Sequence, residues 1–286
     1  MELNIPDEIN KCTVCNEELV ASRRHCPTCQ NDAGAPNVRA SQKESNKRLL
    51  EERFQKSQDF AKENNCIEIF KKFKVAIDNE SDVVISMPAN VARGIFEDPR
   101  NLYANYEKLV GSNVRKPASL IDDQHRYAVS GKLFGSYANS IIYGVLSLTD
   151  KGLSTYGQVF CKLRAIAIQK RTSFLEKNSY KFVEEHEIRF GSKLPLGHIS
   201  DWNDKSKLVL AKLAKYLKKD QNEKDWQDLL LNSDGMNREK DEFVEAHIFD
   251  GFDSKAISSI KLNATKNLKR EERLDFEIAE ANFKKL

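Results

Sequence analysis

The chain has 286 residues, of which 40% are hydrophobic and 31% are charged, so it can bury one substantial core and carry a small additional module. Its formal net charge of +3 is too small to indicate nucleic-acid binding by itself. No apolar run approaches the roughly 20 residues that cross a bilayer, and the first residues, MELNIPDEINK, do not resemble a secretory signal. We therefore expect no membrane association.

Four of the six cysteines form two C-x-x-C pairs near the start of the chain. Two such pairs supply four thiolates, which is the closed coordination of structural zinc and leaves no open position for catalysis. Two disulfides or a thioredoxin-like redox pair are the competing interpretations, but a redox pair needs a strand–helix fold that about thirty residues cannot provide. The sequence therefore predicts a zinc ribbon over residues 1–35 in a reducing, cytoplasmic compartment. Its ligands would be Cys12, Cys15, Cys26 and Cys29.

Residues 36–80 are expected to form a linker followed by a charged helix. From about residue 41 to residue 73 there is no Gly or Pro, and helix formers dominate. The apolar positions form a sparse stripe, which favours a helix lying on the following domain. A short coiled coil is less favoured because the heptads are not sustained. The stripe consists of Leu50, Phe54, Ala61 and Phe70.

From residue 81 onward, short apolar runs alternate with helical patterns. The helices are expected at 207–219, which has a basic face, and at 267–286. This order predicts an α+β fold with mixed short strands rather than a βαβ series. The strands are expected at VVISM (83–87), SIIYGVLSL (140–148), YGQVFCKL (156–163) and FVEAHIF (243–249).

Several common catalytic signatures are missing from the sequence. It has no G-x-S-x-G, P-loop, H-E-x-x-H or kinase pattern. The five histidines are scattered without ligand spacing, and only His247 stands beside an acidic residue of a predicted strand. The sequence therefore does not indicate an α/β-hydrolase, a P-loop nucleotide-binding protein, a zinc metalloprotease or a protein kinase.

What remains is a fixed order of short motifs. Tyr143-Gly144 is followed by Tyr156-Gly157, which opens a strand ending in Leu-Arg, and then by R-T-S-F at 171–174 and F-V-E-A at 243–246. This order, over about residues 126–260, resembles bacterial ADP-ribosyltransferase-like domains that act as toxins or phage-defence effectors. Within that group it resembles the mRNA-modifying toxins of toxin–antitoxin–chaperone systems. The resemblance implies an ADP-ribosyltransferase-like mixed-sheet catalytic domain over residues 81–286.

The resemblance also implies roles for individual residues. Loss of nicotinamide from NAD passes through an oxocarbenium-like ribose, which a carboxylate stabilises, and Glu245 would be that group. Glu242 lies an odd number of residues away and would face the other side of the strand. The resemblance places Ser173 beside the glutamate and implies that Arg171 and Thr172 contact NAD. It also implies that Tyr143 and Tyr156 stack on the nicotinamide ring, and that Arg126 or Arg93 binds the phosphates.

The expected ligands are NAD as substrate and structural zinc. The expected target is nucleic acid, possibly mRNA, because ribbons commonly contact nucleic acid and basic residues flank the cysteines. A protein target stays open, and an antitoxin protein is expected as a partner. The alternative is a non-enzymatic zinc-ribbon module that binds nucleic acid or protein, with the tyrosines in an ordinary core. The basic residues are Lys11, Arg23, Arg24 and Arg39.

Overall fold

The computed structural model describes residues 11–20, 22–117, 120–263 and 268–286. A seven-stranded sheet lies at its centre, in the order β5-β4-β8-β2-β1-β3-β9, and all its neighbouring strands are antiparallel. These strands are β1 (Asp82–Met87), β2 (Ile141–Ser147), β3 (Val159–Leu163), β4 (Thr172–Leu175), β5 (Ile199–Asp201), β8 (Glu245–Phe249) and β9 (Ile257–Leu262). A second small sheet pairs β6 (Leu231–Asn232) with β7 (Glu242–Phe243).

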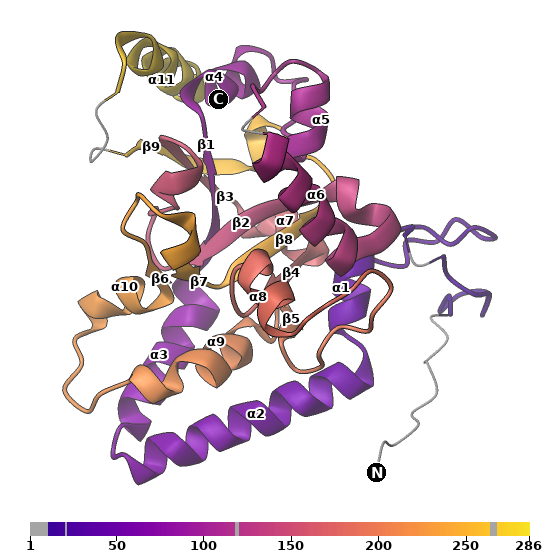
Figure 1. The fold of residues 1–286 in the computed structure, drawn as a ribbon, viewed down its shortest axis with the longest axis vertical. Coiled ribbons are helices and arrows are strands. Elements are labelled where there is room, and N and C mark those ends of the chain that lie inside the picture. Colours follow the sequence, from indigo (N-terminus) through magenta and orange to yellow (C-terminus); the bar gives the residue numbers. More distant parts are fainter. Residues whose placement is uncertain (1–10, 21, 118–119, 264–267) are drawn as a thin grey trace.

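One face of the central sheet is apolar and covered by helices. Alternate residues of the strands, such as Ile85, Leu146 and Ile248, enter the main hydrophobic core. In Figure 1, α11 lies beside α4 at one end of this layer, whereas α2, α3 and α9 lie together at the other. The helices are α2 (Glu44–Glu63), α3 (Ile67–Glu80), α4 (Ala89–Glu97), α9 (Lys205–Leu213), α10 (Trp226–Leu230) and α11 (Arg270–Phe283).

The other face is only partly covered. Its residues from β2, β4 and β8 pack on a smaller core that includes Leu133, Phe134 and Phe182. The elements near this face are α1 (Pro36–Ser41), α5 (Tyr106–Gly111), α6 (Leu120–Phe134) and α8 (Ser179–Glu185), whereas Ile168 of α7 (Ala165–Ile168) packs in the main core. Short 3-10 turns complete the described chain at η1 (Gly135–Ser140), η2 (Ser154–Tyr156), η3 (Gln169–Arg171), η4 (Ala214–Tyr216), η5 (Glu223–Asp225), η6 (Arg238–Lys240) and η7 (Ser254–Ala256).

The mixed helix-and-sheet class predicted from the sequence is confirmed. The charged stretch, however, forms two helices instead of one, with a break between α2 and α3. Asn65 adopts a left-handed conformation (φ 55°) there, and the Asn64 amide donates to the Phe60 carbonyl. Asparagine tolerates this conformation and ends helices much as glycine does, which a search for Gly and Pro misses. The stripe residues of α2 and α3 lie in the main core.

The predicted strand at 243–249 is also divided. Val244 separates β7 from β8, and its carbonyl accepts from the Leu146 amide. Glu242 therefore belongs to the small sheet, where its carboxylate contacts Lys181 at 2.5 Å and Lys212 at 3.4 Å. In the described part of the chain, no helix combines the length and apolarity needed to span a bilayer.

Candidate functional site

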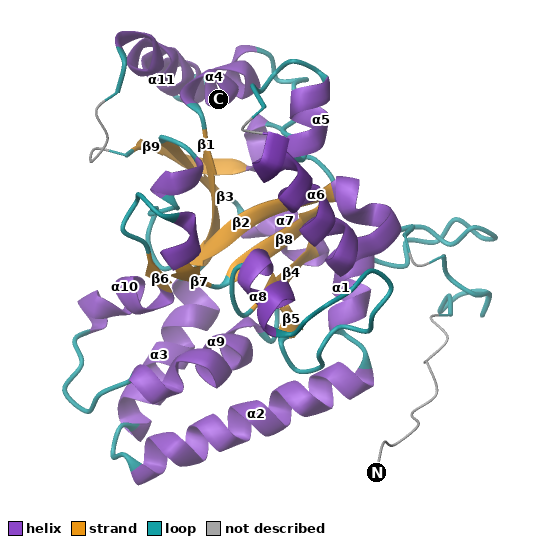
Figure 2. Cartoon of the chain, viewed as in Figure 1, coloured by secondary structure: helices purple, strands orange, loops and turns teal. Residues whose placement is uncertain are grey.

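The cysteine-containing segment consists of two similar turns. In the first turn the Asn16 amide donates to the Cys12 carbonyl, and in the second turn the Gln30 amide donates to the Cys26 carbonyl. Both of these residues have φ near 60°, and each turn is closed by a single antiparallel bridge, Lys11 with Glu18 and His25 with Asp32. Figure 2 shows this segment as loops that project beside α1. The repeat of one local geometry brings the two C-x-x-C pairs face to face.

The four cysteine sulfurs all lie within 4.8 Å of one another and form no disulfide. Two of the Sγ–Sγ distances are 3.6 Å (Cys12 to Cys29) and 3.5 Å (Cys15 to Cys26). A zinc–sulfur distance of about 2.3 Å in a tetrahedron gives a sulfur–sulfur edge of about 3.8 Å, so the spacing fits. Hydrogen bonds from the Cys15 and Val14 amides lower the pKa of Cys12 to about 6. For Cys15 the Glu17 amide also lowers the pKa, but burial and the other three thiols outweigh it and raise the pKa to about 12. These residues are close enough to bind one metal ion.

Two of the basic residues expected to contact phosphates are engaged elsewhere. Arg24 forms a bidentate pair with Asp32, with a shortest distance of 2.6 Å. Arg39 is buried and donates to main-chain carbonyls of the ribbon. Phosphate contact by Arg24 and Arg39 stays a prediction, and part of each guanidinium already binds protein oxygens. Lys11 and Arg23 remain exposed.

A large cleft opens on the partly covered face of the central sheet. Its volume is about 800 Å³, within the roughly 300–1,000 Å³ of small-molecule and cofactor sites. β2 forms most of its floor, together with Val84 and Ser86 of β1 and Glu245 of β8. Residues from α5, α6, α8 and the β6–β7 connection contribute to its walls. The polar and aromatic side chains lining it include Asn105, Tyr106, Arg115, His125, Arg126, Ser130, Tyr143, Thr155, Tyr156, Asn178, Ser179, Tyr180, Lys181, Asn237, Arg238 and Glu245.

Glu245 is the one carboxylate among the described residues that line the cleft. Its side chain is buried, with 7% of the residue exposed. Oε2 accepts from the Ser179 amide at 2.9 Å and from the Ser179 hydroxyl, and it lies 3.0 Å from His247 Nε2. These partners fix one carboxylate oxygen at the base of the cleft.

Strand register explains how this carboxylate reaches the cleft. Glu245 lies opposite Val145 of β2 and Leu175 of β4, so it is a polar residue in an apolar row. The neighbouring row contains Tyr143, His247 and Ser173. Because side chains alternate along strands, both rows point away from the main core. Glu242 was predicted to face the other side of the same strand, but the break at Val244 means that this alternation does not extend to Glu242.

Two glycines bring β1 close to the floor strands. A Cβ on Gly144 would lie 2.7 Å from Ile85 Cδ1, and one on Gly157 would lie 2.3 Å from the Met87 carbonyl carbon. Larger residues would push β1 away from β2 and β3. The two tyrosine–glycine motifs thus place a cleft-lining tyrosine beside a position where only glycine fits.

Three guanidinium groups converge on one side of the cleft. Arg126 and Arg115 lie over the Tyr106 ring at 4.3 and 4.9 Å, and Arg238 lies over Tyr156 at 4.9 Å. Burial lowers the pKa of Arg115, and the nearby charges of Arg126 and Arg238 lower it further. Arg126 Nε is buried without a hydrogen-bond partner. Within the described residues no carboxylate forms an ion pair with any of the three, so an anionic ligand would relieve their mutual repulsion.

Tyr143 and Tyr156 both line the cleft, as the sequence suggested. Burial is the main cause that raises the pKa of Tyr156 to about 12, and the Glu245 carboxylate contributes. The same two causes raise the pKa of Tyr143, whose hydroxyl lies 2.7 Å from Ser130 Oγ. Both phenols therefore stay neutral at physiological pH and can contact a ligand through ring and hydroxyl.

The other residues implied by the resemblance lie elsewhere. Arg171 donates to the carbonyls of Phe249, Asp250 and Gly251, and the buried Thr172 hydroxyl donates to the Ile168 carbonyl. Ser173 lies in a separate hollow of about 20 Å³. Arg93 pairs with Glu97 and Asp275 outside the cleft lining. Of the two arginines proposed for the phosphates, only Arg126 lines the cleft.

Several cleft residues were not assigned a role from the sequence. The partner of Glu245 is Ser179, six residues after Ser173, and Arg115, Arg238 and Tyr106 complete the basic and aromatic wall. In the sequence, Asn178-Ser179 begins four residues after Phe174 of the R-T-S-F motif, and this proximity is the one local hint for Ser179. Nothing local marks the other three, because they come from segments that meet only in the folded chain.

The cluster of Ser179, His247 and Glu245 contains the residue types of a hydrolase triad but differs from one in its geometry. Ser179 Oγ lies 3.2 Å from His247 Nε2, and Glu245 Oε2 lies 3.0 Å from the same nitrogen. In a nucleophilic triad the acid binds one imidazole nitrogen and the serine binds the other. Here both groups share Nε2, so the carboxylate cannot orient the histidine toward the serine. The cluster instead holds the carboxylate.

No protein-family model matches the chain, and no curated protein matches it.

Proposed function

We propose that the chain transfers ADP-ribose from NAD to a macromolecule, with Glu245 as the catalytic carboxylate. The observation that carries this proposal is one buried carboxylate, fixed by three donors, at the base of a cleft whose wall presents three guanidinium groups. A ligand that suits this charge distribution is anionic at one end and develops positive charge at the other. NAD fits that description during loss of nicotinamide.

In this mechanism the pyrophosphate contacts the guanidinium wall formed by Arg115, Arg126 and Arg238, because arginine binds phosphate oxygens through paired donors. The rings of Tyr143 and Tyr156 contact the nicotinamide or its ribose. The second oxygen of Glu245 accepts a hydrogen bond from a ribose hydroxyl and stabilises the oxocarbenium-like transition state electrostatically.

The bond from the ribose C1 to the nicotinamide nitrogen breaks, and nicotinamide leaves with the electron pair. A nucleophilic oxygen or nitrogen of the target then bonds to C1 and loses its proton to water. Ser179 and His247 act as positioning residues in this scheme, because they hold the oxygen of Glu245 that does not face the substrate.

The ribbon would hold zinc as a structural ion through Cys12, Cys15, Cys26 and Cys29, since four thiolates close the shell. We propose nucleic acid, in particular RNA, as the target, in the cytoplasm, as a toxin or anti-phage effector restrained by an antitoxin protein. Support comes from the motif order and from the exposed Lys11 and Arg23 on the ribbon.

The test incubates the full chain with NAD labelled in the adenylate phosphate, together with total RNA or total protein in separate reactions. Label that enters RNA supports the proposal in full, and label that enters protein supports the chemistry but replaces the target. If NAD is neither bound nor consumed with either pool, the enzyme proposal fails. The alternative function, a non-enzymatic zinc-ribbon module that binds nucleic acid or protein, then replaces it.

A further inference from the structure

The short helix α1 connects the cysteine turns to the strand that carries Glu245. It begins at Pro36, directly after the second turn, and packs against β4, β5 and β8. A six-residue helix is too short to be stable alone, so its position depends on what it contacts at each side. Two of its side chains, Asn37 and Arg39, make those contacts.

Arg39 connects α1 to the ribbon. Its guanidinium donates to the carbonyls of Arg23 at 2.8 Å, Gly34 at 2.5 Å and Val20 at 3.2 Å. Only 8% of the residue is exposed, and burial lowers its pKa. These acceptors lie between the two cysteine turns and just after the second, so their positions depend on a folded ribbon.

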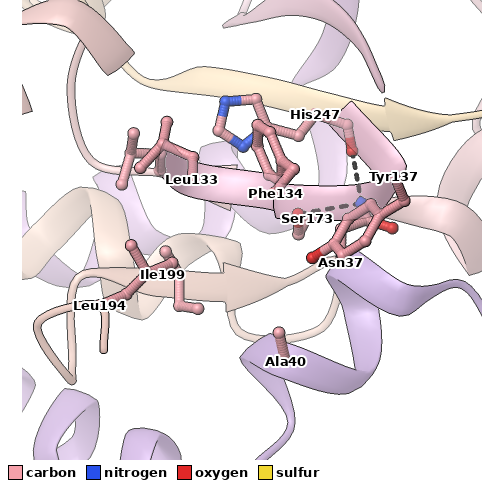
Figure 3. A pocket seen from close by; sticks show the side chains of 10 residues that line it. Asn37, Ala40, Leu133, Phe134, Tyr137, Ser173, Leu194, Ile199 and His247 are labelled. Carbon is pink, nitrogen blue, oxygen red and sulfur yellow. Dashed lines mark hydrogen bonds between the residues drawn. The ribbon is translucent and has the colours of Figure 1, made fainter. Parts of the chain in front are cut away.

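Asn37 connects the same helix to the sheet. Its side-chain amide donates to the carbonyl of His247 at 2.8 Å, to Ser173 Oγ at 3.0 Å and to the Arg171 carbonyl at 3.3 Å. Figure 3 shows this amide reaching both Ser173 and the His247 main chain from α1. Only 2% of Asn37 is exposed, so water does not replace these bonds. His247 is also the residue whose ring contacts Glu245.

We infer that Asn37 is a positioning residue for Glu245, and that through Asn37 and Arg39 the cleft depends on the metal-bound ribbon. Loss of the metal unfolds the turns and removes the acceptors of a buried guanidinium, which must then move to reach water. α1 loosens with it, and the His247 carbonyl loses its side-chain donor. The ribbon is therefore part of the support of the cleft and not only a targeting module.

The test uses hydrogen exchange on the full chain, read at the amides of residues 245–249. Asn37→Ala removes the donor to β8, and Arg39→Lys keeps the charge but cannot reach three carbonyls at once. The matched control is Gln42→Ala at the end of the same helix, which removes a bond to Asp201 of β5 at 2.8 Å and leaves β8 untouched. Metal content is measured for every sample.

Both variants are expected to speed exchange in β8 by about five- to tenfold, the effect of roughly one lost hydrogen bond, while Gln42→Ala leaves it unchanged. Removing the metal from the wild type with a chelator should give the same change in β8. The chelator should add little to Asn37→Ala, because the connection is already broken. Unchanged protection of β8 in metal-loaded Asn37→Ala overturns the inference, and so does unchanged protection in metal-free wild type.

The positioning role rests on the proposed function and has its own measurement. In Asn37→Ala the kcat for nicotinamide release should fall by about tenfold, whereas the Kd for NAD stays within about twofold, since Asn37 is remote from the guanidinium wall. A parallel loss in Kd would make the role merely structural. If the wild type does not bind NAD, the proposed function fails, but the exchange data still decide whether the ribbon supports β8.

Discussion

The cysteine turns and the cleft organise their polar groups in opposite ways. The four thiols lie between Cys12 and Cys29, and two copies of one turn are sufficient to bring them within 4.8 Å. The cleft combines Arg115, Arg126, Tyr143, Ser179 and Glu245, which belong to five separate segments joined by strand register and helix packing. Local geometry builds the first site and tertiary structure builds the second.

This difference determines what each site tolerates. The metal turns depend on a few residues and on one ion, so a single ligand change should remove the site completely. The cleft distributes its support over many contacts, so single changes should cost a part of its binding or activity.

Cys26→Ser should abolish stoichiometric metal binding. A structural zinc site of this type has an apparent binding free energy of about 10–16 kcal/mol, and a closed shell with one thiolate missing loses most of it. Elemental analysis of purified protein should find one zinc per chain in the wild type and almost none in Cys26→Ser. Cys161→Ser, at a buried core cysteine, is the control and should keep the metal. A zinc-loaded Cys26→Ser protein would contradict the closed four-thiolate site.

Glu176, which directly follows β4, should make the stability of the fold depend on pH. It lies three residues before Ser179, Arg53 contacts it at 2.6 Å, and His198 Nδ1 lies 2.9 Å away. Burial alone would raise the pKa of Glu176, but these two partners together lower it to about 2. The stabilisation is therefore present above the unfolded pKa near 4.5 and is lost as the pH falls toward 2.

Urea unfolding at pH 7 and pH 3 measures this effect. Glu176→Gln should cost roughly 3 kcal/mol at pH 7 and much less at pH 3. The exposed Glu184→Gln on α8 serves as the comparison and should be neutral at both values. An equal cost of Glu176→Gln at both pH values would show that its charge does not stabilise the fold.

Arg126→Met should weaken NAD binding by about ten- to a hundredfold, the range expected for a lost charge-assisted hydrogen bond. Titration calorimetry against the wild type measures the change. Arg93→Met removes the same charge from an exposed ion pair of α4 and should bind NAD like the wild type. Equal affinities of the two variants would remove Arg126 from the phosphate site.

Ser179→Ala should have the smallest effect of the series. The hydroxyl donor to Glu245 is lost, but the Ser179 amide at 2.9 Å remains. The kcat for nicotinamide release should fall by about three- to tenfold, with an unchanged Kd for NAD. A complete loss of activity would indicate that Ser179 is a nucleophile, in contrast to its role as a support for the carboxylate.

The sequence predicted the four-cysteine cluster because its residues, spacing and turns are all local. It also predicted four strands of the central sheet, β1, β2, β3 and β8, but not β4, β5 and β9. Glu245 was singled out by the resemblance, and it lies at the base of the cleft. The sequence did not predict Arg115 or Arg238, because no short motif contains them. The resemblance pointed to Ser173 within R-T-S-F, whereas the turn into α8 brings Ser179, six residues later, to the carboxylate.

The most direct test of the central claim compares the turnover of NAD by the wild type and by Glu245→Gln, with Glu184→Gln as the matched control. The substitution preserves shape but removes the charge that stabilises the oxocarbenium-like ribose. We expect kcat to fall by about a thousandfold with NAD affinity retained, which is the scale of removing one group that stabilises the transition state electrostatically. Turnover of NAD by Glu245→Gln at the wild-type rate would contradict this expectation.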